Sequence, residues 1–268
     1  MSDLFSVLDK TVLVTGGTHG IGRAIAGGLV AAGARVYVNS RSAGECASVA
    51  EELSAKGFCV GLPADIATED GCVQLAADLT AREPALNVLV NNAGSAWAAP
   101  VGEFPAEAWD SVLAVSLRAP MLLTRELVPA LTAAGTPEDP ARIVNIGSAD
   151  ALRVPEFPTY SAAASKAAIH HITRMVAQEL APSVTANVIA PGTFPSRMTA
   201  DALAAFGDEI AACTPLRRIG REDDLVGAVQ FLCSRAGSYV TGAVLPVDGG
   251  LATCRLGFVP PEYADTEG

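Results

Sequence analysis

The stretch TVLVTGGTHGIGRAIAGGL, residues 11–29, changes its pattern of apolar residues partway along. Residues 11–14 are consecutive β-branched or aliphatic side chains, which is typical of a strand buried on both faces. Glycines follow at 16, 17, 20 and 22, and the Ala-rich segment 21–33 has helical spacing. The stretch therefore predicts a strand, a glycine loop and a helix in direct succession, the repeating unit of a parallel α/β sheet.

The same alternation of strand and helix extends over most of the chain. Further strands are expected at 35–41, 59–66, 86–94, 142–148, 185–192 and 243–250. Helices are expected between them at 44–57, 70–82, 105–134, 161–180 and 221–237, with an irregular stretch after 193. Because the strands are almost continuously apolar, we expect a Rossmann-type doubly wound parallel sheet, an α/β fold with helices on both faces and a single domain.

Composition limits the function classes. The chain has 268 residues, of which 50% are hydrophobic, enough for one sizeable core. Its net charge of −11 argues against non-specific binding to nucleic acid or to an anionic membrane. No uncharged apolar stretch reaches the ~18 residues that a spanning helix needs, so we expect a cytoplasmic protein without membrane contact.

The cysteines indicate neither a disulfide framework nor a zinc site. They are scattered along the chain at 46, 59, 72, 213, 233 and 254, with no C-x-x-C pair and no histidine cluster nearby. We therefore expect buried free thiols and no metal.

Each glycine of the loop after the first strand has a distinct physical role. Gly16 permits the tight turn, Gly20 lets the backbone approach a pyrophosphate, and Gly22 lets the helix pack closely against the strand. The N-terminus of the helix at 21–33 then faces the phosphates. The loop predicts a dinucleotide site.

The end of the second strand favours NADP over NAD. An NAD enzyme tends to carry a carboxylate here for the ribose hydroxyls, and this chain reads Asn39-Ser40-Arg41-Ser42. Arg41 can pair with a 2′-phosphate, to which Ser40 and Ser42 can donate hydrogen bonds. His19 lies in the glycine loop within reach of the same phosphate.

Residues 8 to 252 resemble the short-chain dehydrogenase/reductase family in its single-domain form. Thr15, Gly16, Gly20 and Gly22 match T-G-x-x-x-G-x-G, and Asn91-Asn92-Ala93-Gly94 matches N-N-A-G. The matches continue with Asp65 after the third strand, with NVIAPG at 187–192 and with VDGG at 247–250. FPSRMT at 194–199 further resembles the branch of β-ketoacyl reductases, the rhamnolipid-pathway ketoreductase and gluconate 5-dehydrogenases.

The resemblance implies a catalytic set of Asn, Ser, Tyr and Lys. Ser148 matches the Ser that hydrogen-bonds the substrate oxygen, and Lys166 matches the Lys that holds the nicotinamide ribose and lowers the pKa of the Tyr. Ser116 stands where relatives carry the helix Asn of V-N-L. Its shorter side chain would alter the water relay to the Lys.

The Tyr position departs from the family pattern. In TYSAAASKAAI, residues 159–169, Tyr160 and Lys166 are six positions apart, and the helical i+4 partner of Lys166 is Ala162. Either Ala162 replaces the catalytic Tyr, or Tyr160 is the donor and two Ala are inserted, with Tyr160 lying before the helix and swinging toward the site. Two inserted residues would rotate everything beyond them by about 200°, so we favour substitution.

The implied protein is an NADP-binding domain at 1–255 followed by a polar tail at 256–268. Its expected activity is reversible ketone reduction or alcohol oxidation on a small or medium apolar substrate, with Ser148, Lys166, Tyr160 and Ser116 as the catalytic set. The rival function is cofactor binding without redox turnover. The expected cofactor-binding residues are Gly16, Thr18, His19, Gly20, Ile21, Gly22, Ser40, Arg41, Ser42, Asp65, Ile66, Asn92, Ala93, Gly94, Lys166, Pro191 and Gly192.

Four remaining features concern packing and partners. The resemblance implies a homotetramer or homodimer through the helices at 105–134 and 161–180. His170 and His171 are expected to pack or to face a subunit. Residues 193–206 resemble the family's mobile substrate loop, and Trp97 either lines the substrate mouth or packs.

Overall fold

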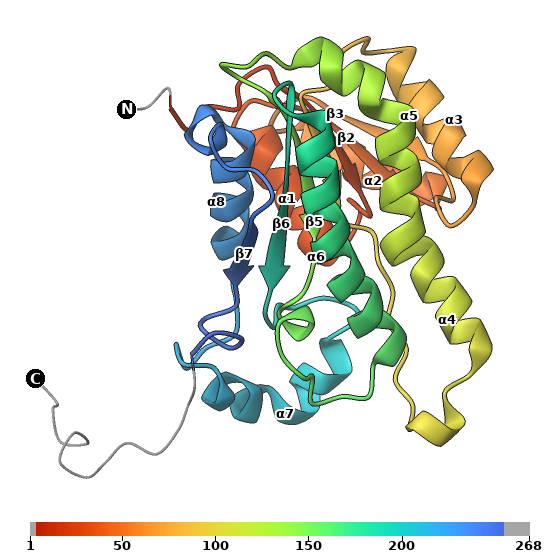
Figure 1. Cartoon of the computed structure of the whole chain (residues 1–268), viewed down its shortest axis with the longest axis vertical. Helices are drawn as coiled ribbons and strands as arrows, with labels where there is room; N and C mark the ends of the chain where they lie inside the picture. Colours follow the sequence, from red (N-terminus) through yellow and green to blue (C-terminus); the bar gives the residue numbers. More distant parts are fainter. Residues whose placement is uncertain (1–3, 255–268) are drawn as a thin grey trace, which may run out of the picture.

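Strand β1 (Thr11–Thr15) lies inside a seven-stranded sheet in the computed structural model, which describes residues 4–254 (Figure 1). All the pairings are parallel, in the order β3-β2-β1-β4-β5-β6-β7. The other strands are β2 (Arg35–Ser40), β3 (Cys59–Pro63), β4 (Val88–Asn91), β5 (Ala141–Ile146), β6 (Val184–Pro191) and β7 (Val244–Val247). The expected doubly wound parallel sheet is confirmed.

Two helical layers cover the sheet because successive strand residues point to opposite faces. Val12 and Val14 of β1 pack in one core cluster with buried side chains of α1 (Gly20–Ala31), α2 (Ala43–Ser54) and α8 (Glu222–Cys233). Leu13 packs on the other face, in the cluster that contains α3 (Glu69–Thr80), α5 (Ala119–Ala134) and α6 (Tyr160–Leu180). Both faces of β1 are therefore buried.

The order of the strands predicts a crevice at one edge of the sheet. The chain moves outward from β1 through β2 and β3 and then returns to β4 on the opposite side of β1. At such a switch point the loops after β1 and β4 leave in opposite directions and open a crevice beyond the carboxyl ends of the strands. In Figure 1 these ends point to the lower part of the molecule, where α7 (Ala200–Cys213) lies.

The structure differs from the sequence expectations in three elements. The expected helix at 105–134 is divided into α4 (Ala106–Leu113), a π-helical segment at Ala114–Arg118, and α5. The stretch after 193, expected to be irregular, contains α7, which bends at Phe206. Tyr160 is the first residue of α6, so the expectation that it precedes this helix is wrong.

The cysteine expectation holds in part. All six thiols are free, but Cys213 and Cys254 are exposed where burial was expected. The expected tail at 256–268 lies outside the described residues. Within residues 4–254, none of the helices combines the length and apolar character that a bilayer crossing requires.

Candidate active site

The glycine loop after β1 has the backbone that its sequence predicts. Gly16 and Gly20 have φ values of +61° and +48°, a region that side chains with a Cβ disfavour. A Cβ on Gly22 would lie 2.2 Å from the carbonyl oxygen of Gly16. Glycine at these positions therefore allows the tight turn and the close approach of α1.

The loop after β4 fastens the glycine loop in place. The side-chain amide of Asn92 donates to the carbonyl oxygens of Thr15 and Gly16 at 2.9 and 3.1 Å. The hydroxyl of Thr15 accepts from the backbone N–H groups of Asn92 and Ala93 at 3.0 and 3.1 Å. These four bonds join the two loops that flank the crevice.

The N-terminus of α1 fits an anionic group. Ser42 and Thr68 cap α2 and α3 with their side chains, whereas His19 makes no such bond at the start of α1. Because the first backbone N–H groups of a helix have no intrahelical partner, those of α1 are available to a phosphate. The residues present therefore fit the pyrophosphate of a dinucleotide.

Arg41 directly follows β2 and provides a positive charge where the sequence predicts a contact with a 2′-phosphate. Arg41 is exposed, and no interaction within residues 4–254 engages its guanidinium. Ser40 and Ser42 bond locally: the hydroxyl of Ser40 accepts from the N–H of Ser42 at 3.2 Å, and the hydroxyl of Ser42 accepts from Glu45 at 3.2 Å. Arg41 thus fits the charge of a 2′-phosphate without losing another partner.

Glu45 is a neighbour that the sequence analysis missed. One of its carboxylate oxygens lies 3.2 Å from Nε2 of His19 and 3.4 Å from Nη1 of Arg197. Arg197 belongs to the loop before α7, so this carboxylate joins that loop to α2. A carboxylate on α2 paired with residues far away in sequence leaves no signal in the chain itself.

The other expected cofactor residues surround the same edge of the sheet. Asp65 is exposed after β3, and its carboxylate accepts from the N–H of Ala67 at 3.1 Å. Ile66 is buried beside it. Gly192 follows β6, where a Cβ would lie 2.8 Å from Cα of Asp248. Glycine at 192 therefore lets the ends of β6 and β7 approach each other.

Lys166 of α6 reaches the ends of β4 and β5 with its ammonium group. Its ammonium donates to the carbonyl oxygen of Ile146 at 2.7 Å. Burial lowers the pKa of Lys166 to about 8. A Cβ placed on Gly94 would lie 3.5 Å from Nζ of Lys166 and 3.4 Å from Oγ of Ser116. The three residues therefore meet at one point.

Ser116 occupies the π-helical segment between α4 and α5, and its hydroxyl is buried. This hydroxyl accepts from the backbone N–H of Ser95 at 3.3 Å, which ties the segment to the loop after β4. Single π turns inside helices are frequent at functional sites. Ser116 follows the buried residues Ala108 and Val112 at intervals of four, so it continues their buried side.

Ser148 lies at the carboxyl end of β5, just before a short 3-10 helix at Ala149–Ala151. Its hydroxyl oxygen accepts from the backbone N–H of Asp150 at 3.1 Å. Because that bond uses a lone pair of the oxygen, the hydroxyl proton is left to donate outward. Burial raises the pKa of the Asp150 carboxyl, and Arg153 pairs with it at 3.2 Å.

Tyr160 and Ala162 lie on different sides of α6. Tyr160 packs edge-on against Phe104, with ring centroids 5.4 Å apart, and its side chain is 40% exposed. On a helix, Ala162 lies about 40° from Lys166, whereas Tyr160 lies about 120° away from it. The half-buried methyl group of Ala162 is thus the nearer of the two to the face that bears Lys166.

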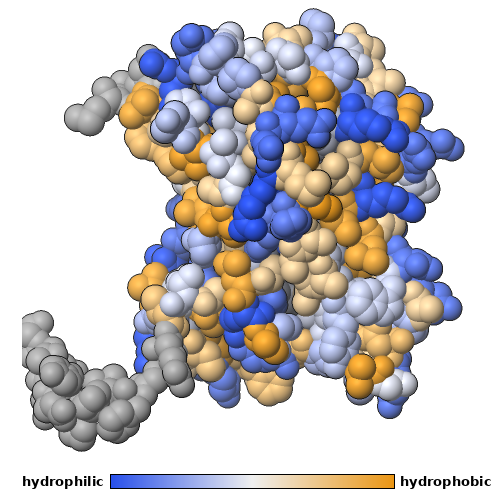
Figure 2. All heavy atoms as spheres, in the orientation of Figure 1, coloured by the Kyte–Doolittle hydropathy of each residue, from blue (hydrophilic) through white to orange (hydrophobic). Residues whose placement is uncertain are grey.

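Exposed apolar side chains accompany the segments around the crevice. They come from the loop after β4, the segment before α6 and the region of α7, and apolar patches are visible on the lower half of Figure 2. Trp97 is 51% exposed among them. The set is Trp97, Leu152, Val154, Phe157, Met198 and Phe206.

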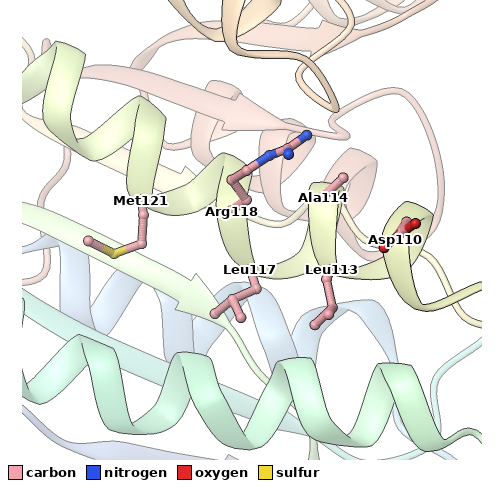
Figure 3. A pocket seen from close by; sticks show the side chains of 6 residues that line it. All are labelled: Asp110, Leu113, Ala114, Leu117, Arg118 and Met121. Atoms are coloured by element: carbon pink, nitrogen blue, oxygen red, sulfur yellow. The ribbon is translucent and has the colours of Figure 1, made fainter.

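A hollow of about 450 Å³ lies away from the glycine loop, over the π-helical segment and the adjoining helices. Figure 3 shows Leu113, Leu117 and Met121 projecting from one side of this segment and Arg118 from another. The three apolar residues follow at intervals of four, so they form one stripe. None of the expected catalytic residues lines this hollow.

Comparison with known proteins gives matches over nearly the whole chain. Residues 16–252 match the family model described as enoyl-(acyl carrier protein) reductase. A rhamnolipids biosynthesis 3-oxoacyl-[acyl-carrier-protein] reductase of Pseudomonas aeruginosa is 40% identical over 93% of this chain and 99% of its own length. A gluconate 5-dehydrogenase of Gluconobacter oxydans is 34% identical over 93% and 97%.

Solved structures give the same result. The Pseudomonas aeruginosa RhlG/NADP active-site complex superposes with a TM-score of 0.90 at 39% identity, covering 94% of this chain and 100% of that one. A putative NAD(P)-dependent gluconate 5-dehydrogenase from Beutenbergia cavernae with bound NADP has a TM-score of 0.86 at 38% identity, covering 92% and 98%.

Proposed function

The chain belongs to the short-chain dehydrogenase/reductase family, and we propose that it is an NADP(H)-dependent oxidoreductase that interconverts a ketone and a secondary alcohol. The observation that carries this proposal is the meeting of Lys166, Ser116 and Gly94 of the loop after β4, which is itself bonded to the glycine loop, at the switch point of the sheet. Ligands of open α/β sheets bind at this edge, and the side chains there suit a dinucleotide and a carbonyl group.

The proposed cofactor is NADP(H), which supplies the hydride when bound. Backbone N–H groups at the start of α1 hold the pyrophosphate, and Arg41 pairs with the 2′-phosphate. Lys166 holds the nicotinamide ribose. The NADP complexes among the structural relatives support this assignment.

Ser148 is proposed to orient the substrate, because its hydroxyl accepts from Asp150 and keeps its own proton free. That proton can hydrogen-bond the oxygen of a ketone or an alcohol. The negative charge that develops on the oxygen during reduction is stabilised by this donor and by the nearby ammonium of Lys166.

The proton for the new alcohol must come from a group other than a phenol at 162. Lys166 suits this role, because a pKa of about 8 lies close to neutral pH, where general acids work best. We propose that a water molecule carries the proton from Lys166 to the substrate oxygen. Such a site should turn over slowly, since a positioned general acid is worth about 10²–10⁴ in rate.

The proposed substrate is small or medium in size and apolar. The exposed apolar side chains on the segments around the crevice support this. Trp97 belongs to the loop after β4, and Met198 belongs to the loop before α7. The net charge of −11 makes a strongly anionic substrate less favourable over the protein as a whole.

The alternative function is binding of NADP(H) without redox turnover, as a subunit, a sensor or a non-redox catalyst. The presence of Ala162 at the helical partner position of Lys166 is the observation in its favour. Both functions use the same crevice, so turnover is the property that separates them.

We also propose that the protein forms a homodimer or homotetramer in the cytoplasm. The apolar stripe of Leu113, Leu117 and Met121 supports a subunit contact along α4 and α5 (Figure 3). Six unpaired cysteines support a reducing compartment.

The experiment that tests the function is transfer of deuterium from NADPH labelled at the reactive carbon. The protein is incubated with a panel of ketones and β-ketoesters, and the alcohols are analysed by mass spectrometry. We expect slow formation of alcohol that carries deuterium at the carbinol carbon. NADPH that binds without deuterium reaching any member of the panel, in the wild type or in Ala162→Tyr, would favour the alternative.

A further inference from the structure

We propose that His170 is a positioning residue for Ser148. The Nε2 atom of its neutral imidazole accepts a hydrogen bond from the backbone N–H of Ser148 and so fixes the residue whose hydroxyl faces the substrate. The proposal rests on the proposed function insofar as Ser148 is the group that orients the substrate. The contact itself is a property of the fold and can be tested without turnover.

Three residues of α6 lie on the same side of the helix, because they follow one another at intervals of four. Ala162, Lys166 and His170 follow at this spacing, which places side chains one above another on a helix. Lys166 reaches the carbonyl oxygen of Ile146, and His170 reaches the next residues of the same chain segment. The helix therefore contacts the end of β5 at two consecutive turns.

The backbone N–H of Ser148 donates to Nε2 of His170 at 3.4 Å. His170 is 5% exposed, so little water competes for this bond. At the other end of the same residue, the hydroxyl oxygen of Ser148 accepts from Asp150. Ser148 is thus fixed by its N–H and by its oxygen, which leaves the hydroxyl proton as the free group.

Gly147 shows how closely the imidazole packs on this segment. A Cβ at 147 would lie 2.1 Å from Nε2 of His170, a distance that real Cβ atoms do not adopt. The N–H of Gly147 also donates to the carbonyl oxygen of Ile189 in β6 at 2.7 Å. The segment that leads into Ser148 is therefore held between β6 and the ring of His170.

The acceptor role requires a particular protonation state. Nε2 can accept only when it carries no proton, so the ring must be neutral with its proton on Nδ1. Burial, together with the cations Lys166 and Arg174 of the same helix, lowers the pKa of His170 to about 4. The ring therefore stays neutral at physiological pH.

The neighbouring histidine provides a matched control. His171 follows directly on α6 but is exposed to solvent. A substitution there changes the same residue type on the same helix without touching the end of β5.

The first test is nitrogen NMR of the imidazole rings in the full chain, which contains three histidines. His170→Gln identifies the signals of His170 by their loss. We expect a ring with a protonated Nδ1 and an unprotonated Nε2 that resists protonation well below the ordinary value of about 6.5. A proton on Nε2, or titration near the ordinary value, would overturn the proposal.

The second test compares reduction kinetics in the wild type, His170→Gln, His170→Phe and His171→Gln. Gln keeps an acceptor near the Nε2 position, whereas Phe keeps a ring and removes the acceptor. Residues that orient metal ligands are worth about 10–100-fold in activity, and by the same reasoning we expect His170→Phe to lower kcat by about tenfold or more. His170→Gln should restore most of kcat, and NADPH binding should be unchanged in all three variants.

The pH profiles of kcat should also distinguish the substitution at 170 from its control at 171. The loss of kcat at acidic pH that follows protonation of His170 should be absent in His170→Gln and present in His171→Gln. Equal kcat values for Gln and Phe at 170, with NADPH binding intact, would overturn the proposal. Absence of turnover in every protein, with the NMR signature of His170 present, would contradict the proposed function and leave the contact established.

Discussion

Replacing Ala162 by Tyr should restore a proton donor that this site lacks. The new side chain would lie about 40° around α6 from Lys166 and about 6 Å along the axis, on the face that reaches the end of β5. An ammonium about 5 Å away, at an effective dielectric constant of about 20, favours the phenolate by about 3 kcal/mol. This lowers the phenol pKa from about 10 by about two units, which brings it close to neutral pH.

A donor tuned in this way is worth about 10²–10⁴ in rate. We therefore expect Ala162→Tyr to raise kcat for ketone reduction by that factor, measured as loss of NADPH absorbance with the same panel of ketones and β-ketoesters. The dissociation constant for NADPH should change by less than about twofold, because residue 162 lies outside the glycine loop.

Tyr160→Phe is the matched control, because it removes the neighbouring phenol and keeps the ring contact with Phe104. We expect its kcat to match that of the wild type. The reasoning is refuted if Ala162→Tyr binds NADPH and leaves kcat unchanged, or if Tyr160→Phe abolishes the activity of the unaltered chain.

Three further predictions concern the cofactor, the glycine loop and pH. Arg41→Ala should weaken NADPH binding by about tenfold or more and leave NADH binding unchanged in fluorescence titrations, because a charge-assisted contact is lost. Gly22→Ala should lower the free energy of unfolding by about 1–3 kcal/mol in urea titrations, since its Cβ would meet a backbone oxygen at 2.2 Å. The folded-state pKa of His170 is about 4 and its ordinary value is 6.5, so the unfolded chain binds more protons between these values. Stability should therefore be highest above pH 6.5 and fall by up to about 3 kcal/mol as the pH drops to 4, a loss that His170→Gln should remove.

The sheet could be predicted from the sequence because each strand is a short apolar run and each helix has its own periodicity. The glycine loop could be predicted for the same local reason, since glycines at 16, 20 and 22 directly follow such a run. Both signals depend on residues that are neighbours in the chain.

The features that could not be predicted depend on contacts between distant residues. Glu45 meets Arg197 across the crevice, and His170 meets Gly147 across the packing of α6 on β5. The π-helical segment around Ser116 preserves the apolar pattern of an ordinary helix, so periodicity predicted one long helix in its place. Tyr160 starts α6 and packs on Phe104, a partner that its local sequence does not indicate.

The most direct test of the account as a whole is a paired titration of the wild type with NADPH and with NADH, followed by the fluorescence of its two tryptophans. The account predicts saturable binding of NADPH that is at least about tenfold tighter than binding of NADH, because Arg41 replaces the carboxylate of an NAD site. Equal binding of the two dinucleotides, or binding of neither, would contradict it.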